Sequence, residues 1–320
     1  MTSLIEEVRN SIERQTLRIA KEMGRAIDTR LGVQEETITD VLLNGIQSEN
    51  EENFFTRKFS HKEEGNITGA DWLWCIGEPG SWITFAVQAK IANMKTGRIN
   101  FLHYRGGRQY TQLVSFSRRF HFIPKYSFYA KVDEETELFS RTLLEPKDIS
   151  LAQWSFTGIS PKYIKQISNS SERHISRVLQ FAIPWSYVFY TGKHENMKLA
   201  ETIAANLEDI YWLFTNKYRR WRKEKPIFNY DRLISEDPQP TRMISKSIPL
   251  PVLYLATQMS FPAKIPISNV GILSGIPVSQ ALGVELKKIE GSRQWKIFPR
   301  LFVREINSIK NEERNWIVHS

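Results

Sequence analysis

One stretch, Thr68 to Lys90, constrains the fold more than any other part of the chain. It reads TGADWLWCIGEPGSWITFAVQAK. Two apolar, aromatic-rich runs flank Gly77-Glu78-Pro79-Gly80, a combination of residues that favours a tight turn. The pattern therefore predicts a β-hairpin. Gln88 and Lys90 are two positions apart, so on a strand their side chains point to the same face of the sheet.

The predicted hairpin carries three polar groups that suit phosphate chemistry. Asp71 opens it, and Gln88 and Lys90 close it. Carboxylate and amide oxygens suit Mg²⁺, and a lysine ammonium can neutralise charge that grows on a phosphoryl oxygen. These residues predict a divalent-metal site beside a phosphate. The same residues also allow a purely structural interpretation, in which Asp71 caps a strand and Lys90 protects a sheet edge.

GADW followed by VQAK resembles the active-site hairpin of the PD-(D/E)xK nuclease superfamily. The closest resemblance is to the Mrr-like restriction endonucleases, in which a glutamine replaces the acid of (D/E)xK. Roughly the first 190 residues are also similar to an uncharacterised domain family associated with bacterial phage defence, which carries an EETITD helix and a GADW…QAK hairpin. The resemblance to the PD-(D/E)xK superfamily implies a metal-dependent nuclease.

The resemblance implies a role for each polar residue of the hairpin. Asp71 would bind Mg²⁺ or Mn²⁺ directly. Gln88 would offer its side-chain oxygen to the ion or orient a water molecule. Lys90 would position the attacking water or stabilise the phosphorus centre. An amide is a weaker ligand than a carboxylate, so the number of metal ions stays open.

The resemblance also implies acids outside the hairpin. In the superfamily an acid from the first core helix reaches the metal, and residues 35–46 predict that helix because Ile38, Leu42 and Ile46 form one stripe. The matching position is Glu36, and its neighbour Glu35 stays an alternative. Glu64, just upstream of Asp71, is a further candidate ligand. Acids also gather in first helical turns because the helix dipole favours them there.

The remaining elements predict the rest of such a core. Residues 54–64 alternate as a strand does, residues 109–120 have helical spacing, and residues 126–129 read as another strand. The predicted fold class is α/β: a restriction-endonuclease-like αβββαβ core with a mixed central sheet flanked by helices, plus C-terminal additions.

The charge balance favours a nucleic-acid partner. The chain has 320 residues and a net charge of +9, which attracts polyanions. Basic residues that follow Lys90 are predicted to contact the nucleic-acid backbone: Lys95, Arg98, Arg105 and Arg108. Two amides on the next helix, Gln109 and Gln112, are predicted to contact the substrate. A second basic cluster spans residues 217–225. Each set could instead be an ordinary solvated surface.

Composition also bears on compartment and domain organisation. The single cysteine, Cys75, excludes an intrachain disulfide and favours a reducing cytoplasm, and no apolar run is long enough to cross a membrane. We expect an N-terminal helix over 1–34, the nuclease-like core over 35–192, and a helical and β-hairpin extension over 193–320. The N-terminal helix either packs on the core or pairs with a second copy, so a homodimer is an alternative.

The sequence therefore predicts metal-dependent hydrolysis of phosphodiester bonds, with DNA preferred as substrate, in defence against foreign DNA. No phosphate-binding Gly-x4-Gly-Lys-Ser/Thr loop, His-Glu-x2-His pair or Gly-x-Ser-x-Gly elbow is present, which disfavours those enzyme classes. The alternative function is a catalytically inactive nucleic-acid-binding or interaction module on the same fold.

Overall fold

The computed structural model describes residues 3–28, 34–93, 95–99, 107–132, 134, 136, 149–168, 174–190, 194, 196–222 and 239–249. All of them belong to a compact unit that spans Met1–Ala263, and the other unit, Lys264–Ser320, lies outside the described residues. The hairpin predicted near the C-terminal end of the chain also lies outside them.

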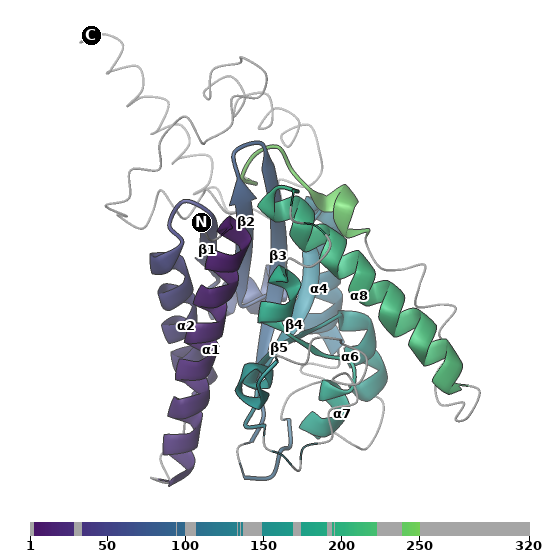
Figure 1. The fold of residues 1–320 in the computed structure, drawn as a ribbon. Helices are drawn as coiled ribbons and strands as arrows, with labels where there is room; N and C mark the ends of the chain where they lie inside the picture. Colours follow the sequence, from purple (N-terminus) through teal and green to yellow (C-terminus); the bar gives the residue numbers. More distant parts are fainter. Residues whose placement is uncertain are drawn as a thin grey trace. The chain divides into compact units, whose positions relative to one another are not determined.

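A six-stranded mixed sheet forms the centre of the unit (Figure 1). Its strands lie side by side in sequence order: β1 (Phe54–Lys58), β2 (Trp72–Glu78), β3 (Ser81–Ile91), β4 (Ile123–Tyr129), β5 (Phe156–Ile159) and β6 (Ile183–Pro184). Neighbours are antiparallel except β3 and β4, which are parallel.

Helices and turns flank the sheet: α1 (Leu4–Asp28), α2 (Glu35–Glu49), α3 (His61–Glu63), the π-helical turn η1 (Glu64–Thr68), α4 (Arg108–Phe120), η3 (Leu151–Ser155), α6 (Pro161–Ser168), α7 (Ile175–Leu179), η4 (Trp185–Phe189), α8 (Leu199–Arg222) and η5 (Pro240–Met243). The order α2–β1–β2–β3–α4–β4 matches the predicted αβββαβ arrangement and confirms the α/β class. None of the described helices is both long and apolar enough to cross a membrane.

The predicted hairpin is confirmed, with a tighter turn than expected. Trp72 pairs with Val87 and Glu78 with Ser81, so only Pro79 and Gly80 connect the strands. Gly80 has a φ of +84°, a left-handed conformation that glycine adopts without strain. The other two residues of the expected turn therefore belong to β2.

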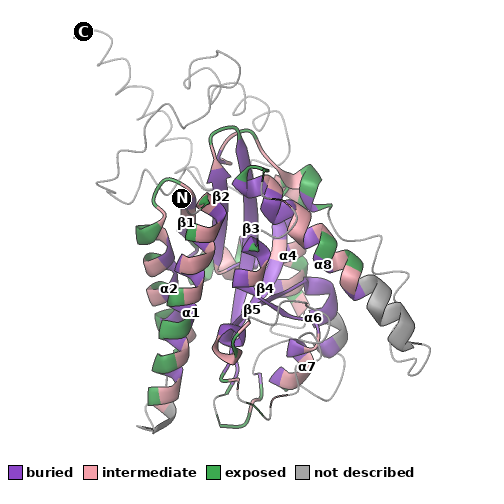
Figure 2. Cartoon of the chain, in the orientation of Figure 1, coloured by how far each residue is buried: buried purple, intermediate pink, exposed green. Residues whose placement is uncertain are grey.

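The two faces of β3 differ in chemistry. Trp74, Phe85 and Trp185 pack together on one face, with ring centroids 4.9 Å apart for the two tryptophans. Gln88 and Lys90 lie on the opposite face, because side chains alternate along a strand. Figure 2 shows how continuously the sheet is buried. The aromatic face thus gives the polar face a rigid support.

Two helices mark the two sides of the sheet. α4, behind the strands in Figure 1, contributes to the cavity that contains Lys90. α8 lies on the opposite side, where Lys125 of β4 donates a hydrogen bond to the Tyr211 hydroxyl at 3.2 Å. Because α8 packs on β2 and β3, this helix belongs to the same compact unit as the sheet. The N-terminal helix α1 packs on α2 and on the turns η3 and η4.

Two predicted strands are shorter in the structure. β1 ends at Lys58, because Ser60 then caps α3 in a reciprocal capping box with Glu63. The aromatic, apolar run over residues 185–190 also predicts a strand, and this prediction is wrong, because only Ile183 and Pro184 pair with β5. The chain then turns as η4, which buries Trp185, and its indole N–H donates to Ser127 Oγ at 2.7 Å. An aromatic run can fill a core without forming a strand.

Candidate active site

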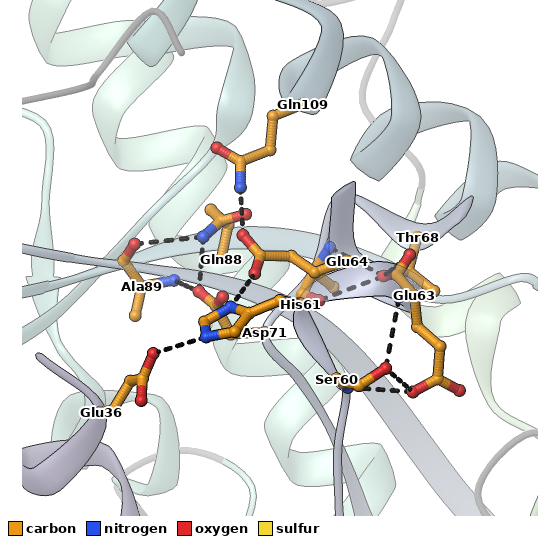
Figure 3. Close-up of polar contacts among 11 residues, drawn as sticks. Glu36, Ser60, His61, Glu63, Glu64, Thr68, Asp71, Gln88, Ala89 and Gln109 are labelled. Atoms are coloured by element: carbon orange, nitrogen blue, oxygen red, sulfur yellow. Dashed lines mark hydrogen bonds and ion pairs between the residues drawn. The ribbon is translucent and has the colours of Figure 1, made fainter. Parts of the chain in front are cut away.

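A cavity of about 740 Å³ lies where the N-terminal end of α2, the end of β3, α3 with η1, and the first turn of α4 meet. Charged and polar side chains dominate its wall, and Figure 3 shows the contacts among several of them. Five predicted site residues reach this cavity: Glu36, Glu64, Asp71, Lys90 and Gln109. A site assembled from four separate elements can hold its side chains in fixed mutual positions.

Asp71 lies on the floor of the cavity, immediately before β2. Its backbone N–H donates to Val87 O, which fixes it beside β3. Its Oδ2 accepts hydrogen bonds from Gln88 Nε2 and from the Ala89 backbone N–H, each at 2.5 Å. Loss of hydration raises the pKa of Asp71 well above its usual value; Lys90 lowers the pKa, whereas Glu64 and Glu35 raise it. The Glu64 and Glu35 carboxylates therefore each lie close enough to repel the Asp71 carboxylate.

Gln88 lies behind Asp71 and is fully buried. Its Nε2 donates to Asp71 and to Ala89 O. The opposite orientation of the amide group is unfavourable, because it would place the amide oxygen against the Asp71 carboxylate. Its Oε1 is buried without a hydrogen-bond partner, and Gln88 does not line the cavity. The structure thus uses Gln88 as a donor that holds Asp71. Its predicted role as a metal ligand through the oxygen stays a prediction.

Lys90 lies on the cavity wall and only 9% of its surface is exposed. It shares a face with Gln88, as predicted from their spacing, because their neighbours on β4 are Tyr126 and Phe128. Among the described residues, no carboxylate lies within 4.0 Å of its ammonium. A nearly buried ammonium in this position can meet an anionic group that enters the cavity.

The first helical turn of α2 contributes two acids with different surroundings. Glu35 is half-buried, and its Oε2 accepts the Ile91 N–H at 2.8 Å. Glu36, the position that matches the superfamily pattern, is exposed at the mouth and lies 3.0 Å from His61 Nε2. Of the two acids, Glu35 is the one whose charge raises the pKa of Asp71. Helical spacing could have separated them, because Glu35 lies four residues before the buried Thr39.

The two predicted substrate-contacting amides both donate hydrogen bonds to the η1 turn. Gln109 Nε2 donates to Glu64 Oε1, and Gln112 Nε2 donates to Gly65 O at 3.2 Å. His61, which sequence patterns did not single out, lies between Glu36 and Glu64, with Nδ1 3.6 Å from Glu64. A lone histidine in a polar segment carries no spacing signal, so only the fold could reveal this position.

The predicted basic contacts lie outside the cavity wall. Lys95 and Arg98 are exposed in the turn after β3, and Arg98 forms an isolated backbone bridge with His174. Arg108 is exposed at the start of α4, next to Gln109. Arg105 and the side chains of the 217–225 cluster lie outside the described residues. Lys58, which was not predicted, does line the cavity and pairs with Asp40 at 2.6 Å.

The residues present fit an open divalent-metal site better than a closed one. In the described part of the chain, no group of three His, Cys, Asp or Glu side chains is arranged to hold an ion by itself. Mg²⁺ binds proteins through one or two carboxylates and takes its other ligands from water and substrate phosphates. Asp71 together with either Glu64 or Glu35, which share its cavity, provides two carboxylates for such a site.

Gln88→Glu is expected to destabilise the metal-free protein by about 2 to 4 kcal/mol, because it replaces a donor by a buried negative charge beside Asp71. Mn²⁺ should recover part of that loss if the ion binds at Asp71. Urea denaturation with and without Mn²⁺ measures both effects. Gln88→Met is the neutral control, and it should lose stability without any recovery beyond that of the wild type. Equal behaviour of the two variants would contradict the expectation.

Comparison with known proteins identifies one family. The model of a family described as "Family of unknown function (DUF6615)" matches residues 8–266. The match includes every element that lines the cavity. No curated protein matches the chain.

Proposed function

We propose that this chain, which belongs to the DUF6615 family of unknown function, is a divalent-metal-dependent nuclease that hydrolyses phosphodiester bonds, with DNA as the preferred substrate. One observation carries the proposal: Asp71 and the nearly buried ammonium of Lys90 open into one cavity together with Glu35 and Glu64. Acids that repel one another, next to a lysine, suit a cation and a phosphate.

Each residue has a separate task in this proposal. Asp71 and one further carboxylate of the cavity, Glu64 or Glu35, would hold Mg²⁺ or Mn²⁺, which when bound supplies charge neutralisation at the phosphate oxygens. Gln88 and the Ala89 N–H keep the Asp71 carboxylate in place. Lys90 would stabilise the negative charge that develops as water attacks phosphorus.

A role in defence against foreign DNA, in the cytoplasm, is part of the proposal. It rests on the sequence resemblance to a domain family associated with phage defence and on the single cysteine. The second candidate function is an inactive nucleic-acid-binding module. It is favoured by the finding that no three acidic, histidine or cysteine side chains among the described residues enclose an ion.

The decisive experiment incubates the purified chain with supercoiled plasmid DNA and Mg²⁺ or Mn²⁺, with and without a chelator. We expect nicked and linear products only with free metal. A parallel reaction with single-stranded RNA of similar length decides between the two nucleic acids. Binding of DNA without any cleavage in either metal would favour the inactive module.

Binding to duplex DNA is expected to depend strongly on salt and weakly on base sequence. If about six phosphates are neutralised, the affinity should fall roughly a thousandfold between about 50 and 200 mM salt. The variant Arg98→Glu with Arg108→Glu, at two of the exposed positions predicted to contact the nucleic-acid backbone, should reduce the slope. Arg18→Glu with Lys21→Glu, at exposed positions on α1, is the charge-matched control. An affinity that does not change with salt would contradict a nucleic-acid partner.

A further inference from the structure

The acid that completes the cavity is presented by an unusual piece of backbone. Glu64 is the first residue of η1, a single π-helical turn that follows α3. Such turns are rare and occur often at functional sites. The Glu64 side chain is 17% exposed and lies on the cavity wall with Asp71 and Lys90. The direction of the Glu64 side chain therefore depends on the contacts that hold η1 in place.

Three contacts clamp η1 to the start of α4. Gln109 donates to the Glu64 carboxylate and Gln112 donates to the Gly65 carbonyl. Gly69 ends η1 with a φ of +65°, and a Cβ there would lie 2.4 Å from the carbonyl oxygen of Gln109. Only glycine allows that approach. Of the two amides, only Gln109 touches a carboxylate.

The donor to the Glu64 carboxylate is the neutral amide of Gln109, although a positively charged side chain could donate the same hydrogen bond. Glu64 and Asp71 are close enough for the Glu64 charge to raise the pKa of Asp71. A lysine at position 109 would cancel that charge, whereas a glutamine fixes the carboxylate and leaves it negative. Gln88 acts on Asp71 in the same way. Both acids are thus oriented and remain available to a cation.

We propose that Gln109 is a positioning residue that holds Glu64 as a second carboxylate ligand of the divalent cation. The inference rests on the proposed function and deepens it, because it chooses Glu64 as the second carboxylate and names the residue that orients it. Partners that orient a metal ligand typically change metal affinity by about 10- to 100-fold when they are removed.

The test is Mn²⁺ affinity of the full chain by calorimetric titration, with urea denaturation alongside. Gln109→Leu should weaken Mn²⁺ binding by about tenfold or more. Gln112→Leu is the matched control: it breaks a similar hydrogen bond between α4 and η1 but frees no carboxylate. It should change the affinity less than about twofold, although both variants lose similar stability. Gln109→Lys, which still donates to Glu64, should also weaken Mn²⁺ binding while the fold stays intact.

Several results would overturn the inference. Equal loss of Mn²⁺ affinity in Gln109→Leu and Gln112→Leu would show that the clamp is only structural. Wild-type affinity in Gln109→Lys would show the same, and this variant decides if Gln109→Leu does not fold. If the wild type binds Mn²⁺ and cleaves DNA, and Gln109→Leu has the same Mn²⁺ affinity, only this inference is overturned and the proposed function stands. Wild-type protein that neither binds Mn²⁺ nor cleaves overturns the proposed function as well.

Discussion

Lys90→Ala is expected to slow DNA cleavage by about a hundred- to a thousandfold, with little change in affinity for duplex DNA. The ammonium is nearly buried on the cavity wall, so its removal affects an interaction that strengthens only as charge develops on the phosphate. Single-turnover cleavage at saturating Mn²⁺ measures the rate, and a salt titration of binding measures the affinity.

The control for Lys90 is Lys58→Ala. Lys58 also lines the cavity, but its side chain is exposed and paired with Asp40. Its loss should change the rate only a few-fold, because exposed ion pairs contribute little. Lys90→Met, which keeps most of the side-chain volume, separates loss of charge from loss of packing. Nicking activity that persists in both Lys90 variants would place the chemistry at another site.

Asp71→Asn is expected to have two effects of opposite sign: it should abolish most stabilisation by Mn²⁺ and raise the stability of the metal-free protein at neutral and alkaline pH. Asparagine can keep the hydrogen bonds to the Ala89 N–H and the Gln88 amide through its oxygen. It removes the charge that burial and the neighbouring acids disfavour.

The pH dependence follows from the raised pKa of Asp71. Above the usual pKa of an aspartate and up to the raised one, the folded protein binds more protons at this group than the unfolded chain. The free energy of unfolding of metal-free wild type should therefore fall as pH rises through that interval, by at most about 1.4 kcal/mol per pH unit. In Asp71→Asn this part of the slope should be absent.

Urea denaturation across pH, with and without Mn²⁺, measures both effects of Asp71→Asn. At a Mn²⁺ concentration of about 100 times Kd, binding stabilises the wild type by about 2.7 kcal/mol. Glu36→Gln, at the exposed mouth of the cavity, is the control and should leave the slope nearly unchanged. Unchanged Mn²⁺ affinity in Asp71→Asn would move the ion to other ligands.

Local patterns were enough to predict the hairpin, the shared face of Gln88 and Lys90, and the order of elements around them. Each of these depends on neighbours in sequence: turn residues, a period of two, or helical spacing. These features are therefore present in the fold, and the structure confirms the predicted α/β class.

Contacts between distant segments could not be predicted in this way. The sequence favoured Glu36 and could not predict that Glu35 accepts the Ile91 N–H, because this contact depends on how α2 meets β3. Gln109 and Gln112 lie on the expected helix, yet they face η1 and not the open surface. The position of a glutamine in the sequence is the same whether its amide contacts a carboxylate of the protein or a substrate, so the sequence alone does not reveal the partner.

The strand order of the sheet has a consequence for how the charged site is assembled. Because the strands lie in sequence order, each can add to one that precedes it, and only the parallel step from β3 to β4 requires a crossover through α4. The same helix brings Gln109 to Glu64. The helix that brings β4 beside β3 is thus also the one that fixes the Glu64 carboxylate, so the orientation of this acid depends on completion of the central sheet.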